Sequence, residues 1–324
     1  REAALALARD ADALVHNYRP GVMERLGLGY AHVRAVNAGI VYVHASGYGP
    51  SGAEAADGSF DLLAQARGGL MSVTGEPDGP PLPAGVPVAD QVGAMIAAFA
   101  TVSGLLYRQR TGRGVELDVS LLGSQIALQA FNITNYLFTG RVPGRRGRKG
   151  ATPFWNVYRG SDDRHFVIGM LFDRRWREFC DALCRPDLAD DPRFATYRKR
   201  VVEHAPELIA ILDEVFATRP AIAWVQTLRA AGMLVAPVQD YAEVAADPQA
   251  LANGYIQEVR NPRYGTVRMV ALPVTVDGRP LPVRGLAPEL GEHTEEALLN
   301  AGYTWEEIER LRREGAIGPS AREA

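Results

Sequence analysis

The sequence predicts an α/β fold, and three observations lead to this prediction. Helical and strand patterns alternate between residues 12 and 46, which is typical of a sheet whose strands are joined by helices. The run from Ile40 to Val43 is continuously apolar, as expected of a parallel strand covered on both faces. The 324 residues are 47% hydrophobic and 23% charged, which is a globular composition with room for two domains.

The first half of the chain alternates short elements with loops. A stretch rich in glycine and proline runs from residue 47 to 85, and loops of this composition around a sheet commonly build sites. In chain order, we expect a helix from Arg1, a helix end at "ADALVHNYRPG" (11–21), helices at "VMERLGL" (22–28) and "AHVRAVN" (31–37), a strand at "GIVYVHASGYG" (39–49) and a helical "DLLAQARGGLMS" (61–72).

The pattern changes in the second half. Residues 91–110 are the longest apolar helix, ending in a basic turn and Gly112 as a C-cap should. The expected elements then are a strand at "VELDVSLL" (115–122), helical "GSQIALQAFNITNYLF" (123–138), two strands in 154–170, several helices to Ala252, a strand pair and two short helices. We predict a large domain over 1–148, a small α+β domain over 149–255, and a segment, 256–324, that returns to the large domain.

Composition narrows the classes of partner and location. The net charge of −3 gives no basic field for nucleic acid or an anionic membrane, so we expect small molecules or a second copy of the chain. We identify no membrane span or signal sequence, which predicts a cytoplasmic protein. Cys180 and Cys184 match no zinc spacing and are expected as reduced core thiols; the six histidines also lack metal-ligand spacing. No metal is predicted.

Asp90, in "PAGVPVADQVGAM", has two interpretations. Aspartate is a good N-cap residue, and on position alone the cap is favoured. The same position at the positive end of a helix would keep the carboxylate ionised. The small residues Gly93, Ala94 and Ala97 leave room beside it, so Asp90 could attack an activated acyl group. The pattern leaves both interpretations open.

Two basic motifs are candidate anion sites. In "HNYRPGVMERLGLGY", Tyr18, Arg19 and Arg25 offer a ring and two cations to a nucleotide-like ligand, although cations also satisfy a helix C-terminus. The loop "GRRGRKG" at 144–150 suits phosphate or carboxylate as well as a solvated hinge.

Seven motifs follow one another along the chain: "ADALVHNYRPGVMERLGLGY", "NAGIVYVHASGYGPSG", "FDLLAQARGGLMSVTGEPDGPP", "AGVPVADQVGAM", "LLYRQRTGRGVELDVSLL", "ADPQALANGYIQEV" and "APELGEHTEEAL". In this order they resemble the class III CoA-transferases, a family that also includes the α-methylacyl-CoA racemases. The resemblance implies a Rossmann-like large domain with a smaller inserted α+β domain, in an interlocked homodimer. It also implies a further N-terminal segment that would precede Arg1.

The resemblance also assigns roles. Asp90 matches the aspartate that forms acyl-aspartyl and aspartyl-CoA intermediates while CoA passes from an acyl-CoA to a small carboxylic acid. No cofactor beyond CoA is implied. The residues falling where the family contacts CoA or lines its channel are Asn17, Tyr18, Arg19, Arg25, Gly58, Ser59, Phe60 and Asp61.

Two alternatives remain within the resemblance. A racemase would need a histidine at the position of Phe60, and phenylalanine cannot carry a proton. A CoA-binding but inactive relative is the other alternative. The arginines of the basic loop suggest a dicarboxylic substrate, and we hypothesise that Arg145, Arg146 or Arg148 holds its second carboxylate.

Overall fold

The computed structural model describes residues 1–148, 150–170 and 173–318, and the chain divides into two compact units. The first unit comprises Arg1–Arg145 and Pro288–Ala324, and the second comprises Arg146–Ala287. The predicted boundaries at residues 148 and 255 stay a prediction; in this division, the hairpin of β7 (Ile256–Asn261) and β8 (Gly265–Val270) belongs to the second unit.

The first unit is built on a parallel sheet. Strands β1, β2 and β3 lie in that order, so the prediction of an α/β fold is confirmed. Residues 13–16, which we expected to end a helix, form the strand β1 because they pair with residues 41–44 of β2. The elements are α1 (Glu2–Arg9), β1 (Ala13–His16), α2 (Val22–Arg25), α3 (Tyr30–Val36), β2 (Val41–Ser46), α4 (Asp61–Arg67), α5 (Leu70–Val73), α6 (Val88–Thr111), β3 (Val115–Ser120), α7 (Leu121–Leu128), α8 (Ala130–Thr139), α15 (Thr294–Asn300) and α16 (Trp305–Arg313).

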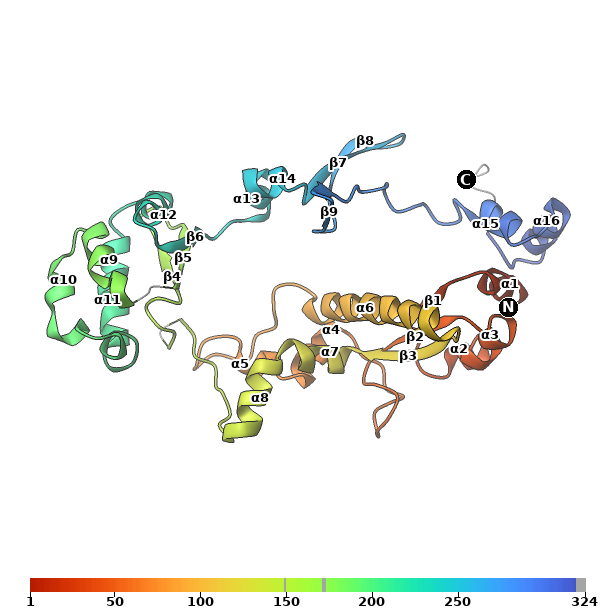
Figure 1. Ribbon diagram of the computed structural model, residues 1–324, viewed down its shortest axis with the longest axis horizontal. Coiled ribbons are helices and arrows are strands. Elements are labelled where there is room, and N and C mark those ends of the chain that lie inside the picture. Colours follow the sequence, from red (N-terminus) through yellow and green to blue (C-terminus); the bar gives the residue numbers. More distant parts are fainter. Residues whose placement is uncertain (149, 171–172, 319–324) are drawn as a thin grey trace. The chain divides into compact units, whose positions relative to one another are not determined.

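Helices cover both faces of the sheet. Val41 and Val43 of β2 pack with Ala97 of α6 on one face, while Tyr42 packs with Val33 of α3 on the other. Figure 1 shows α6 running along the three strands. This alternation explains the continuous apolar run of β2, since successive side chains enter different cores.

Helix α6 corrects one expectation. Its 24 residues are long and apolar enough to pass as a membrane span by length and composition, whereas we identified no such segment in the sequence. A core helix can pass the same test. Helix α6 contacts the sheet closely: a Cβ on Gly104 would lie 2.5 Å from Val41 Cγ1, so this contact requires glycine.

The second unit has an antiparallel sheet in the order β4-β5-β6. Its core is aromatic, with Phe216 packed against Tyr158, Phe166 and Trp224. Its elements are β4 (Asn156–Arg159), β5 (His165–Met170), η1 (Asp173–Arg175), α9 (Trp176–Ala182), α10 (Asp187–Asp190), η2 (Pro192–Phe194), η3 (Lys199–Glu203), α11 (Ala205–Phe216), α12 (Ala221–Ala230), β6 (Leu234–Pro237), α13 (Tyr241–Ala246), α14 (Pro248–Ala252), β7, β8, β9 (Thr275–Val276) and β10 (Arg279–Pro280).

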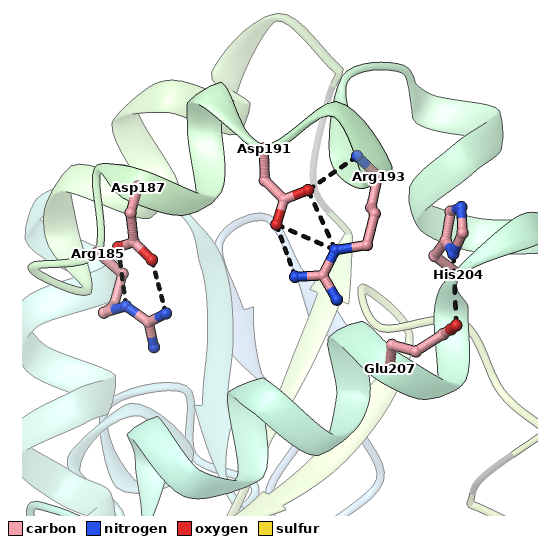
Figure 2. Close-up of polar contacts among 6 residues, drawn as sticks. All are labelled: Arg185, Asp187, Asp191, Arg193, His204 and Glu207. Atoms are coloured by element: carbon pink, nitrogen blue, oxygen red, sulfur yellow. Dashed lines mark hydrogen bonds and ion pairs between the residues drawn. The ribbon is translucent and has the colours of Figure 1, made fainter.

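Ion pairs between residues close in sequence lie on the surface of this unit (Figure 2). Arg185 pairs with Asp187, Arg193 with Asp191, and His204 with Glu207. The hydrogen bond from Arg193 is the main reason that the pKa of Asp191 lies below its usual value. Because solvent screens these pairs, we assign them little stability and no catalytic role.

The two cysteines differ from each other. Cys180 is buried, and this burial raises the pKa of its thiol to about 12. Cys184 is exposed, so the expectation that it is a core thiol is wrong. It follows the C-terminal end of α9 with a positive φ of 57°. The chain turns at this residue, and the side chain of Cys184 lies outside the core.

Candidate functional site

A pocket of about 570 Å³ opens at the carboxyl ends of the three parallel strands. Segments that follow parallel strands converge at one edge of a sheet, which is where open α/β folds usually bind ligands. Its lining comes from the ends of all three strands, from the loop before α4 and from the first turns of α6. The residues are Asn17, Tyr18, Arg19, Pro20, Ala45, Ser46, Gly47, Asp57, Gly58, Ser59, Phe60, Asp90, Gly93, Ala94, Val119 and Leu121.

The pocket brings together most of the candidate residues from the sequence. One part of its wall is formed by Asn17, Tyr18 and Arg19, and another by Gly58, Ser59 and Phe60. Asp90, which belongs to α6, also lines the cavity. Of the residues expected to contact CoA or line its channel, two are not among the lining residues. Arg25 lies exposed on α2 beside Gly21, and Asp61 lies next to the start of α6.

Asp90 is the third residue of α6 and not its cap. The helix begins at Val88, and its free amides are capped from another helix: Asp61 Oδ1 accepts hydrogen bonds from the backbone N–H of Ala89 at 2.7 Å and of Asp90 at 3.3 Å. The interpretation of Asp90 as the N-cap is therefore wrong. The cap that we sought in the local sequence is supplied by a residue 29 positions earlier.

The carboxylate of Asp90 is exposed and lines the pocket. Among residues 1–148, 150–170 and 173–318, we find no hydrogen bond or ion pair to its side chain. Partial desolvation, and then the negative charge of Asp61, raise the pKa of Asp90 above its usual value. The expectation that the helix lowers this pKa is not met, but a more basic carboxylate is also a better nucleophile.

Glycine allows the wall of the pocket to close around Arg19. A Cβ on Gly58 would lie 2.9 Å from Arg19 Nη2. Gly93 has a similar role in α6, where a Cβ would lie 2.8 Å from Leu121 Cδ2. Gly93 and Ala94 line the pocket together with Asp90, whereas Ala97 is buried against the sheet.

A polar network on the parallel strands includes Ser46, which lines the pocket. His44 Nδ1 is 3.1 Å from Asp118 Oδ2, and Ser46 Oγ donates to Asp118 Oδ1 at 2.8 Å. The ring of His44 stacks on that of His16 with centroids 4.6 Å apart. Burial is the main reason that the pKa of His16 falls below its usual value, with the adjacent His44 contributing. Sequence reasoning missed this network, although His44 and Asp118 stand near the ends of predicted strands.

The arginines of the basic loop do not act as one group. Arg145, in the first unit, donates to the backbone oxygens of Glu76, Pro77 and Gly79. Arg148, in the second unit, donates to Asp213 and the backbone oxygen of Val157 and lies over the ring of Tyr158. Arg146 is exposed. Lys149, from the same motif, lies outside the described residues.

Comparison with known proteins gives a consistent answer. The model of CoA-transferase family III matches residues 1–294. The chain is 34% identical over 292 residues to an acetyl-CoA:oxalate CoA-transferase of Acetobacter aceti, covering 89% of this chain and 73% of that protein. It is 31% identical over 313 residues to a succinyl-CoA:glutarate CoA-transferase of Mus musculus, covering 96% and 71%.

The fold comparison agrees with the sequence comparison. The crystal structure of a CAIB/BAIF family protein from Brucella suis matches with a TM-score of 0.83 and 30% identity, over 93% of this chain and 78% of that one. A family match across most of the chain, similar enzymes and the same fold lead to one conclusion. The chain belongs to CoA-transferase family III and is an enzyme of that class.

Proposed function

We propose that the protein transfers CoA from an acyl-CoA to a carboxylic acid through covalent intermediates on Asp90. The observation that carries this proposal is the carboxylate of Asp90, which lines the pocket without a partner among the described residues. A carboxylate that is free, close to small residues and more basic than usual is suited to attack a thioester. The family membership supports CoA thioesters as the substrates.

The reaction proceeds in four balanced steps. The Asp90 carboxylate attacks the thioester carbon, the carbon–sulfur bond breaks, and CoA thiolate leaves an acyl-aspartyl anhydride. The thiolate then attacks the aspartyl carbonyl, which forms aspartyl-CoA and releases the donor acid. The acceptor carboxylate attacks this thioester and again frees the thiolate. The thiolate finally attacks the acceptor's acyl carbon, which yields the new acyl-CoA and restores Asp90.

The wall formed by residues 17–19 is the proposed contact for CoA. Arg19 brings a guanidinium to the pocket, and Tyr18 presents a ring that is 56% exposed. A guanidinium pairs with phosphate, and an exposed ring can stack on a base. Gly58, Ser59 and Phe60 are the proposed lining of the channel to the thioester, and Arg25 is the proposed second cation for the phosphates.

Small dicarboxylic acids are the proposed acceptors. Similar enzymes are named for CoA transfer involving oxalate, glutarate and mesaconate. Arg145 and Arg148 are engaged with other groups of the protein, so the hypothesis of an arginine for the second carboxylate rests best on Arg146, whose side chain is exposed.

A homodimer and a cytoplasmic location complete the proposal. Large apolar side chains of the first unit face solvent in a single chain: Phe99 is 72% exposed, Phe131 85% and Phe138 87%. Such exposure over α6 and α8 supports burial against a second copy. Size-exclusion chromatography with light scattering tests the dimer, and a monomeric mass at micromolar concentration would contradict it.

Covalent trapping tests the central step. Incubation with a panel of acyl-CoA donors, followed by hydroxylamine or borohydride and mass spectrometry, is expected to modify the peptide that contains Asp90. The Asp90→Asn variant should bind the donor but give no adduct. An unmodified wild-type peptide with every donor would contradict the proposal. Binding without modification or turnover would favour the inactive relative instead.

A further inference from the structure

The start of α6 has an unusual arrangement of groups. Its N-cap position is Pro87, whose side chain makes no capping hydrogen bond. The first turn of a helix leaves backbone N–H groups that need partners. Here those of Ala89 and Asp90 both point to Asp61 Oδ1, at 2.7 and 3.3 Å. An external carboxylate therefore replaces the cap that the helix lacks.

Pro87 has a second consequence for Asp90. An acidic side chain at the third position of a helix commonly folds back to accept a hydrogen bond from the N-cap N–H. Proline has no N–H, so this partner does not exist for Asp90. The N–H of Val88 donates to the backbone oxygen of Val86, and those of Ala89 and Asp90 donate to Asp61 Oδ1, so these amides do not compete for the Asp90 carboxylate. The carboxylate stays free for the pocket that it lines.

Asp61 is itself held in place by α4. The buried side chain of Gln65 donates from Nε2 to Asp61 Oδ2 at 2.6 Å, and its Oε1 accepts from the backbone N–H of Ala84 at 2.9 Å. One turn of α4 thus binds both ends of the segment 84–90. One hydrogen bond at Ala84 and two at Ala89 and Asp90 fix the direction in which the first turn of α6 leaves the loop.

We infer that Asp61 is a positioning residue for the nucleophile: it caps α6 from outside the helix, so that the carboxylate of Asp90 is both oriented and left unpaired. This role differs from contact with CoA or its channel, which the family resemblance implies for Asp61. The inference rests on the proposed function of Asp90, but the capping part of it concerns the protein alone. Gln65 belongs to the same arrangement, because its hydrogen bond fixes the orientation of the Asp61 side chain.

Three variants separate the effect of the cap from the effect of the Asp61 charge. Asp61→Ala removes the cap, and we expect kcat to fall on the order of 10²-fold, the loss typical of a small misplacement of a reacting group. In Asp61→Asn alone, the side-chain oxygen can still accept hydrogen bonds from the amides of α6. Its amide nitrogen, however, is a donor that faces the Nε2 donor of Gln65. The double variant Asp61→Asn/Gln65→Glu restores every hydrogen bond, because the introduced carboxylate can accept from both the introduced amide and the backbone N–H of Ala84. Its kcat should return to within about tenfold of wild type.

Several readouts make the experiment decisive. Hydrogen exchange at the amides of Ala89 and Asp90 should accelerate in Asp61→Ala and recover in the double variant, with or without activity. The acidic limb of kcat/KM should lie at lower pH in the double variant than in wild type, because the charge has moved one turn away. Asp10→Asn, at the exposed residue that ends α1, is the matched control and should change nothing.

The outcomes distinguish two kinds of failure. If wild type forms no adduct on Asp90, the proposed function fails, while the exchange data still test the cap. If wild type forms the adduct and Asp61→Ala forms it at the same rate, the positioning role is overturned. A double variant that is no better than Asp61→Asn would also overturn it, since the restored hydrogen bonds would then have no effect.

Discussion

The side chains of His44 and Asp118 form a contact of 3.1 Å between Nδ1 and Oδ2 on neighbouring strands. The other ring nitrogen of His44 lies 2.9 Å from the backbone oxygen of Tyr18. Each ring nitrogen of His44 thus faces an oxygen atom, one from Asp118 and one from the backbone of Tyr18. The pair therefore ties the segment that carries Tyr18 and Arg19 to the sheet, directly beside the pocket.

We expect His44→Ala to weaken acyl-CoA binding more than catalysis. Without the ring, the backbone of Tyr18 loses its tie to Asp118, so Arg19 no longer has a fixed approach to the ligand. A charge-assisted hydrogen bond contributes about 1.5 kcal/mol, which corresponds to a roughly tenfold rise in KM for acyl-CoA. Steady-state kinetics check this split. His32→Ala, at an exposed position of α3, is the control; a fall in kcat at constant KM would contradict the prediction.

Gly58→Ala should have a similar effect on the binding of acyl-CoA. The new Cβ would lie 2.9 Å from Arg19 Nη2, so the guanidinium must move. Arg19 is exposed and its side chain is long. The move should therefore change the free energy of unfolding little, but it should weaken the binding of a phosphate. We expect KM for acyl-CoA to rise about tenfold with an unchanged melting temperature. Gly285→Ala, where a Cβ meets nothing within 4 Å, should leave KM unaltered.

Much of this arrangement could be predicted from the sequence, for identifiable reasons. The strand β2 and the helix α6 have long, regular apolar patterns, and Asn17 to Arg19 and Gly58 to Phe60 stand in compact motifs. The cap of α6 could not be found in this way, because Asp61 reaches it through the tertiary fold. The pairing of β1 was missed for the same reason: its four residues form a strand through contacts with β2.

Asp90→Asn should stabilise the protein at neutral pH. The pKa of Asp90 is raised in the folded state, first by desolvation and then by Asp61, so the ionised carboxylate destabilises the fold. That penalty is complete above the folded pKa and vanishes below the unfolded pKa of about 3.9. Replacing Asp90 by asparagine removes it. Thermal unfolding should therefore give a higher melting temperature for the variant at pH 7, and the difference should shrink as the pH falls toward 4.

The ionisation of Asp90 should also determine how kcat/KM falls at acidic pH. Only the carboxylate form of Asp90 can attack a thioester, so kcat/KM should fall as the pH drops through the raised pKa. The change in the melting-temperature difference between wild type and Asp90→Asn should then occur over the same pH range as the fall in kcat/KM. A destabilised Asp90→Asn protein at neutral pH, or a difference that grows on acidification, would contradict the assignment of both effects to Asp90.

Arg146→Gln should discriminate between acceptor acids. If the exposed guanidinium of Arg146 holds the second carboxylate of a dicarboxylic acid, its loss removes one charge-assisted hydrogen bond of about 1.5 kcal/mol. KM for the dicarboxylic acid should then rise roughly tenfold, whereas a monocarboxylic acid, which makes no such contact, should keep its KM. Arg141→Gln, at a second exposed arginine, controls for loss of charge. An equal rise in KM for both classes of acid, or the same rise in Arg141→Gln, would contradict the assignment of the second carboxylate to Arg146.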